Sequence, residues 1–125
     1  MAKREYDPEY IEFVTHFNKG DYEMSHAALV PAWQANTAYA FYKGLIQLAG
    51  ALQHWNSGNA FWAEDLFASS YNLLEKYAPK HKGLDVSKLL ESIEVCNRVA
   101  REAQSHTASN GTPVPELPKI RLILT

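Results

Sequence analysis

The sequence contains one cysteine, Cys96, among its 125 residues. A single thiol cannot form a disulfide within the chain or complete a four-cysteine zinc site. The first ten residues, MAKREYDPEY, also lack the apolar stretch that a signal peptide needs. These absences favour a cytoplasmic protein, in which Cys96 is expected to pack on the buried face of a helix rather than act as a nucleophile.

The sequence also lacks an excess of charge of either sign. Twelve basic and fourteen acidic residues give a formal net charge of -2, and the basic residues are scattered along the chain. Nucleic acid is therefore not expected as a partner. The most apolar segment, from Ala38 to Leu52, is interrupted by Lys43 and Gln47, so it is shorter than the roughly 20 apolar residues that span a bilayer. We expect no membrane association.

No motif of a known reaction is present. The sequence has no glycine-rich phosphate loop, no Gly-x-Ser-x-Gly elbow and no paired catalytic carboxylates. His16, His26 and His54 lack the i,i+3 or i,i+4 spacing that places two metal ligands on one helix face. We therefore predict no cofactor and no metal, and favour a protein that is not an enzyme.

Apolar residues at helical spacing dominate what is present. The pattern predicts an all-α fold, a compact bundle of about five helices arranged as hairpins. The predicted N-caps and starts are Asp7 before Pro8, Asp21, Ala38, Asn59 and Asp85. Pro31 should kink or stop the second helix near Val30. The third helix, Ala38 to Asn56, is expected to be the central one, with Gly50 allowing another backbone to approach.

The composition changes near residue 105, where Ser, Thr, Asn, Gly and Pro replace the helical pattern. We predict a helical bundle domain over residues 1–107 and an extended, proline-containing tail over residues 108–125. The tail ends in a β-prone apolar run that includes Ile120, Leu122 and Leu124. This run is expected to lie in a groove of its own bundle or to pair with a partner.

Several segments together resemble domain-of-unknown-function family 309, a prokaryotic family of small all-helical proteins. They are Phe17-Asn18-Lys19-Gly20-Asp21-Tyr22, then His26 and Trp33, then Gly44-Leu45-Ile46-Gln47-Leu48-Ala49 and Gly58-Asn59. The resemblance covers about Phe13 to Leu74 and implies a compact helical fold. It implies no biochemical role.

The chain departs from this family around His26. Members typically carry a glutamate directly after the corresponding histidine and further glutamates on the same helix, whereas Met24, Ala27 and Val30 occupy the matching positions here. Carboxylates one turn away would orient the imidazole and keep it basic. If relatives use such a site, the resemblance implies that this chain has lost it.

His26 allows two interpretations. In the first, it is a buried neutral histidine hydrogen-bonded to Gln47. In the second, His26, Gln47, His54 and Trp33 line a pocket that binds a small molecule or supports hydrolysis.

Adjacent aromatic residues suggest a different kind of site. Successive helical residues point about 100° apart, so one of Phe61 and Trp62 is expected to project from the bundle. An exposed aromatic side chain can anchor another protein or a second copy of the chain. We favour a non-catalytic interaction module, with Phe61, Trp62, Ile120, Leu122 and Leu124 as its candidate surface. A small-molecule-binding or hydrolytic protein around His26, Gln47 and His54 is the alternative.

Overall fold

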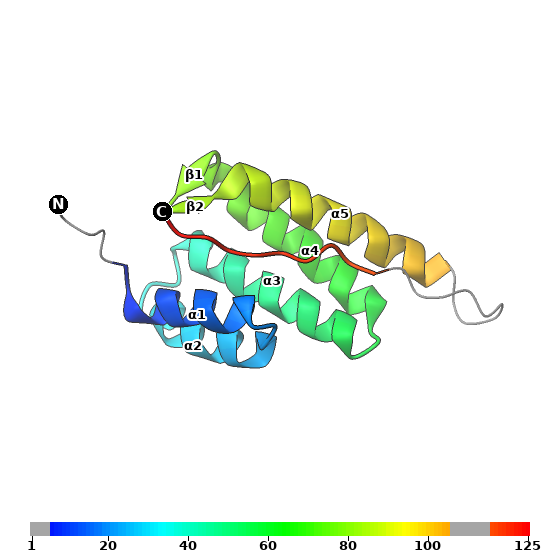
Figure 1. Cartoon of the computed structure of the whole chain (residues 1–125), viewed down its shortest axis with the longest axis horizontal. Coiled ribbons are helices and arrows are strands. Elements are labelled where there is room, and N and C mark those ends of the chain that lie inside the picture. The colour runs from blue at the N-terminus through cyan, green and yellow to red at the C-terminus, as the bar shows by residue number, and fades with distance from the viewer. Residues whose placement is uncertain (1–5, 106–115) are drawn as a thin grey trace.

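The computed structural model describes residues 6–105 and 116–125, and it confirms the all-α fold (Figure 1). The predicted boundary between bundle and tail, at residues 107 and 108, lies outside the described residues. The elements are α1 Pro8–Asn18, α2 Tyr22–Gln34, α3 Ala40–Asn56, α4 Ala60–Leu74, the 3-10 turn η1 Glu75–Tyr77, β1 Lys80–His81, β2 Leu84–Asp85 and α5 Val86–Ser105.

Three of the predicted N-caps are confirmed. The side chains of Asp21, Asn59 and Asp85 each accept a hydrogen bond from the backbone N–H three residues later, at 3.2, 3.3 and 3.0 Å respectively. Each bond satisfies one of the donors that a helix start leaves free.

The capping role predicted for the Asp7 side chain is wrong. Asp7 does precede α1, with Pro8 as the first helical residue, but its side chain caps no backbone N–H. The Asp7 Oδ2 atom instead accepts a hydrogen bond from the Tyr42 hydroxyl at 2.6 Å. This contact connects the start of α1 to α3, and nothing in the local sequence around Asp7 indicates it.

Of the kink or stop predicted near Val30, the stop is wrong, because α2 continues through Pro31 to Gln34. Pro31 has no N–H, so the carbonyl of Ala27, four residues earlier, lacks its helical donor. Both residues are exposed. That carbonyl can therefore be hydrated, which reduces the cost of a proline inside a helix. Trp33 consequently lies within α2 and not beyond a break.

The helices pack mainly on their neighbours in sequence, and α3 is central, as predicted. Figure 1 shows α1 and α2 on one side of α3 and α4 and α5 on the other. Nine of the 17 residues of α3 are buried. The fully buried side chains around it include Phe13, Phe41, Leu45, Phe67 and Ile93, which belong to one core cluster.

The closest approach to α3 occurs at Gly44 and not at the predicted Gly50. A Cβ built on Gly44 would lie 2.7 Å from Leu74 Cγ, whereas one on Gly50 would be 3.5 Å from its nearest neighbour, a carbon of Leu66. The buried Ser70 hydroxyl donates to the Gly44 carbonyl at 2.8 Å. The absence of a side chain at Gly44 thus allows α4 to pack directly on the α3 backbone.

A two-stranded hairpin lies between η1 and α5. Strands β1 and β2 pair antiparallel, and both residues of the connecting turn, Lys82 and Gly83, have positive φ. Two consecutive positive φ values are characteristic of a type I′ turn. A Cβ at Gly83 would collide with the Tyr6 hydroxyl, so glycine is required there for space as well as for conformation.

The C-terminal segment, residues 116–125, runs extended between α1 and α5 (Figure 1). The Asn18 side chain of α1 holds it with two hydrogen bonds, donating to the Leu122 carbonyl at 2.7 Å and accepting from the Leu122 N–H at 2.8 Å. The Thr125 N–H donates to the Gly83 carbonyl at 3.0 Å. The segment is therefore fixed to α1 on one side and to the hairpin on the other.

Candidate interaction surface

Ile120 and Leu122, expected on an interaction surface, belong to the core of this chain. They are 5% and 2% exposed, and Leu124 is partly buried against the same cluster. In this structure the side chains of Ile120 and Leu122 are therefore not available to a partner.

The residues of the predicted pocket are partly buried but are not joined by hydrogen bonds. His26 lies on α2, and Gln47 and His54 lie on α3. In the described part of the chain, no hydrogen bond connects His26 to Gln47, and the buried Gln47 Oε1 and Trp33 Nε1 atoms have no partner. None of these four residues lines either of the two grooves described below.

Phe61 and Trp62 are both exposed, where only one of the two was expected to project. Phe61 is 60% exposed and Trp62 is 50% exposed. Their rings contact edge to face, with centroids 5.3 Å apart. They form the first turn of α4, immediately after the Asn59 cap, so the bundle presents a fixed pair of aromatic rings to solvent.

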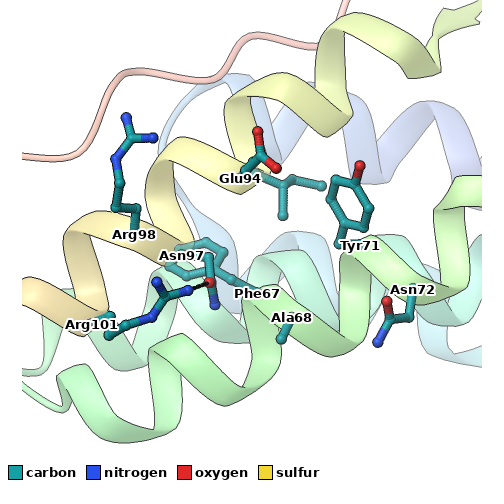
Figure 2. A pocket seen from close by; sticks show the side chains of 9 residues that line it. Phe67, Ala68, Tyr71, Asn72, Glu94, Asn97, Arg98 and Arg101 are labelled. Atoms are coloured by element: carbon teal, nitrogen blue, oxygen red, sulfur yellow. Dashed lines mark hydrogen bonds between the residues drawn. The ribbon is translucent and has the colours of Figure 1, made fainter.

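A groove of about 410 Å³ lies between α4 and α5 (Figure 2). Its lining combines an aromatic floor with polar and charged walls: Phe67, Ala68, Tyr71 and Asn72 from α4, and Ile93, Glu94, Asn97, Arg98 and Arg101 from α5. No local sequence pattern predicts this groove, because α4 and α5 contribute residues that are some 25 positions apart.

Hydrogen bonds fix one end of the α4–α5 groove. Arg101 donates from Nη2 to Asn97 Oδ1 at 2.7 Å, and Asn97 donates to the Glu64 carbonyl at 2.9 Å. Arg101 Nε also forms an ion pair with Glu64 Oε2 at 3.1 Å, and Gln104 donates to Glu64 Oε1 at 2.6 Å. These contacts hold α4 and α5 in register, so the groove is preformed.

Residues 10–66 match the family described as Domain of unknown function (DUF309). This part of the chain belongs to the family. The DUF309 match extends from α1 into α4 and therefore includes His26, Gln47 and the Phe61–Trp62 pair. The hairpin, α5 and the C-terminal segment lie outside it. A search of curated proteins and a search of solved structures each found no match.

A cluster of polar aromatic side chains joins the part of the chain that matches DUF309 to the hairpin, which does not. Three hydrogen bonds connect its members: the Tyr39 hydroxyl with His81 Nε2, the Tyr42 hydroxyl with Asp7 Oδ2, and the Tyr10 hydroxyl with the Lys82 carbonyl. The Lys82 ammonium also lies over the rings of Tyr39 and Tyr42, at 5.7 and 5.6 Å from their centroids. No local sequence pattern indicates this cluster, since its members come from three segments that are distant in the sequence.

Burial keeps the tyrosines of this cluster in their neutral form. It raises the pKa of Tyr10, Tyr39 and Tyr42 well above the ordinary value near 10, and for Tyr42 the hydrogen bond to the Asp7 carboxylate raises it further. Burial and, secondarily, the charge of Lys82 lower the pKa of His81. The hydroxyls therefore remain protonated, and each is hydrogen-bonded to another part of the chain. This arrangement is that of a structural cluster, not of an activated nucleophile or base.

The tyrosine pKa shifts predict instability at alkaline pH. Above pH 10 the unfolded chain releases protons that the folded chain retains on Tyr10, Tyr39 and Tyr42, so stability present below pH 10 is lost as the pH rises. A spectrophotometric titration at 295 nm should show these three tyrosines ionising together with the loss of helical circular dichroism. The Tyr42→Phe variant should remove one tyrosinate from that cooperative step. Ionisation of all seven tyrosines near pH 10 in the folded protein would contradict this expectation.

Two other classes of site gain no support from the geometry. Cys96 is fully buried, and burial raises the pKa of its thiol to about 12. A thiol with such a pKa is a poor nucleophile. Within residues 6–105 and 116–125, no three histidine, cysteine, aspartate or glutamate side chains come close enough together to hold a metal ion. No helix in these ranges has the length and apolar character needed to cross a membrane.

Proposed function

We propose that this DUF309 protein is a non-catalytic helical interaction module that binds another protein, or a second copy of itself, through α4. The observation that supports this most directly is the exposure of two adjacent aromatic side chains, Phe61 and Trp62, at the start of that helix. Aromatic residues of this kind are the commonest anchors of protein interfaces, because they bury a large area with few rotatable bonds.

The α4–α5 groove extends this surface along the helix. Ala68 and Asn72 follow Phe61 by seven and eleven positions, a spacing that places all three on the same face of α4. Ala68 and Asn72 also line the groove, and the small side chain of Ala68 leaves room for a partner to approach α4 closely. A helix laid against α4 and α5 could insert an apolar side chain beside Phe61 and make polar contacts with Asn72 and Arg98.

A site-specific photo-cross-linking experiment tests this proposal. The photoreactive residue p-benzoylphenylalanine would replace Phe61 in the full chain and, in a control, Met24, which is similarly exposed at 49%. We expect position 61 to cross-link to a discrete protein or to a second copy at least several-fold more efficiently than position 24. Adding Trp62→Ala should reduce that product. Equal cross-linking at positions 61 and 24 would show that the aromatic pair is not an interface.

The alternative, a small-molecule-binding or hydrolytic site around His26, Gln47 and His54, has less support. These side chains share no hydrogen bond in the described part of the chain, and they lie outside both grooves. A hydrolytic site would also need a base held by a partner group, and the positions around His26 that could provide one are Met24, Ala27 and Val30.

We also propose that the module acts in the cytoplasm. Its one thiol is buried and unpaired, which suits a reducing compartment. Its near-neutral charge favours protein partners over nucleic acid or membrane surfaces.

A further inference from the structure

We propose that the groove between the C-terminal segment and α5 binds an acidic peptide in extended conformation, which adds a β-strand alongside residues 119–123. The residues that line this site include neither Phe61 nor Trp62, and none of them lines the α4–α5 groove. It therefore does not depend on the function proposed above.

The side chains of the C-terminal segment alternate between core and solvent. Ile120 and Leu122 are buried, whereas Lys119, Arg121 and Ile123 are exposed. This period of two is that of a β-strand, in which backbone groups of successive residues also point to opposite sides. Residues 119–125 thus have the geometry of a strand, although no second strand pairs with them in the described part of the chain.

The backbone hydrogen bonds of the segment identify its open edge. Both backbone groups of Leu122 bond to Asn18, so that edge faces α1. Thr125 directs its N–H the opposite way, to Gly83 of the hairpin. The N–H and C=O groups of Arg121 and Ile123 should point to the same side as the Thr125 N–H. The backbone groups of Arg121 and Ile123 have no hydrogen-bond partner among the described residues. This side therefore presents an unpaired strand edge.

The unpaired edge borders a groove of about 720 Å³ whose opposite wall is α5 and the hairpin. This volume is within the range of roughly 300–1,000 Å³ typical of ligand sites. Residues from both walls line it: Pro79, Lys80, Gly83, Leu84, Asp85, Lys88, Leu89 and Ser92 on one side, and Lys119, Ile120, Arg121, Leu122, Ile123 and Thr125 on the other. Figure 1 shows the two walls running alongside each other.

The charge of the groove indicates the chemistry of its ligand. Four of the five charged side chains that line it are basic, namely Lys80, Lys88, Lys119 and Arg121. The fifth, Asp85, is already engaged with the start of α5, where its Oδ1 accepts the Lys88 N–H. The chain as a whole has a net charge of -2, so this basic groove is a local feature. An acidic peptide would match both the positive walls and the free backbone groups.

The strand edge is held rigidly before any ligand arrives. Ile120 and Leu122 are packed in the core, and Asn18 and Gly83 fix the backbone at two points. A peptide would therefore lose its own conformational freedom on binding, but residues 119–125 would lose little. Strand addition to a preformed edge is the recognition mode that this arrangement favours.

Fluorescence anisotropy with defined probes tests the proposal. The probe is a fluorescein-labelled octapeptide of alternating glutamate and valine, and its control is the corresponding peptide of lysine and valine. We expect the full chain to bind the acidic peptide at least about tenfold more tightly than the basic one. The charge reversals Lys88→Glu and Arg121→Glu should each weaken binding of the acidic peptide by about tenfold. Lys43→Glu, on the exposed face of α3, should leave it unchanged.

Backbone methylation separates strand addition from attraction between charges alone. Methylating alternate nitrogens along one edge of the acidic peptide removes the donors needed to pair with Arg121 and Ile123, whereas methylating the other edge leaves them intact. We expect only the first peptide to lose binding, by at least about tenfold. Equal binding of both methylated peptides, or an unchanged affinity in the Lys88→Glu and Arg121→Glu variants, would overturn the proposal.

Discussion

Replacing Leu122 with alanine is expected to lower the free energy of unfolding by about 2–4 kcal/mol. Leu122 is 2% exposed and packs in the same core cluster as the residues of α1, α3 and α5. Truncating it would leave a cavity between helices whose positions are fixed by other contacts, so the site could not collapse to fill it. Urea unfolding followed by circular dichroism measures the change.

The adjacent residue provides a matched control. Ile123 is 63% exposed, so Ile123→Ala should change the unfolding free energy by no more than about 0.5 kcal/mol. A chain ended after Ser109 would lose Ile120 as well as Leu122, and should be destabilised at least as much as Leu122→Ala. If Leu122→Ala and Ile123→Ala proved equally mild, the C-terminal segment would not be part of the core in solution.

The second large effect is expected at Gly44, where alanine should lower the unfolding free energy by about 1–2 kcal/mol. The new methyl group would lie 2.7 and 2.8 Å from two carbons of Leu74 and 3.3 Å from Leu73 Cβ. Such overpacking typically costs about 1–3 kcal/mol, which exceeds the gain of up to about 1 kcal/mol from replacing glycine inside a helix. Thermal and urea unfolding would both report the loss.

Gly50, on the same helix, should show the opposite sign. An alanine Cβ there would be 3.5 Å from Leu66, an ordinary contact, so the gain in helix propensity should raise stability by about 0.5–1 kcal/mol. The two variants differ only in what the added methyl group meets. A stabilising effect of Gly44→Ala would mean that α4 can move away from α3 without cost.

The proposed functions concern the two faces on which α4 and the C-terminal segment lie. On α4, an aromatic pair is exposed although the rest of the aromatic side chains are mostly packed. Beside the C-terminal segment, next to a basic groove, the backbone groups of Arg121 and Ile123 have no hydrogen-bond partner among residues 6–105 and 116–125. The aromatic pair is exposed to solvent, and the backbone groups have no partner among the described residues. We therefore propose that both features contact binding partners.

Two predictions made from short sequence segments are wrong because the tertiary structure changes the surroundings of the residue concerned. Pro31 does not end α2, because Ala27, whose carbonyl it leaves without a helical donor, is an exposed residue at which water can replace that donor. The Asp7 carboxylate does not cap α1, because the Tyr42 hydroxyl of a helix 35 residues away competes for it. In both cases the tertiary surroundings of the segment decide the outcome: solvent exposure for Pro31 and a distant hydroxyl for Asp7.

The candidate sites could be predicted from the sequence to a smaller extent than the fold. Helical geometry predicted that one of Phe61 and Trp62 would project from the bundle. It did not predict that both would be exposed. The groove beside Arg121 depends on the extended segment lying next to α5, and no pattern in either segment specifies the other. Likewise, Tyr39 and His81 are 42 residues apart, and no sequence pattern indicates that their side chains are in contact.

Helical periodicity, cap residues and the composition change near residue 105 determined the all-α bundle, its central helix and the absence of helix from residues 116–125. These features depend on interactions between residues a few positions apart, which the order of the sequence specifies directly. The tertiary structure alone decided that Ile120 and Leu122 are core residues, that Gly44 is the point of closest approach, and that a basic groove lies beside an unpaired strand edge. Each of these depends on contacts between distant segments, whose geometry is set by how all the helices pack together.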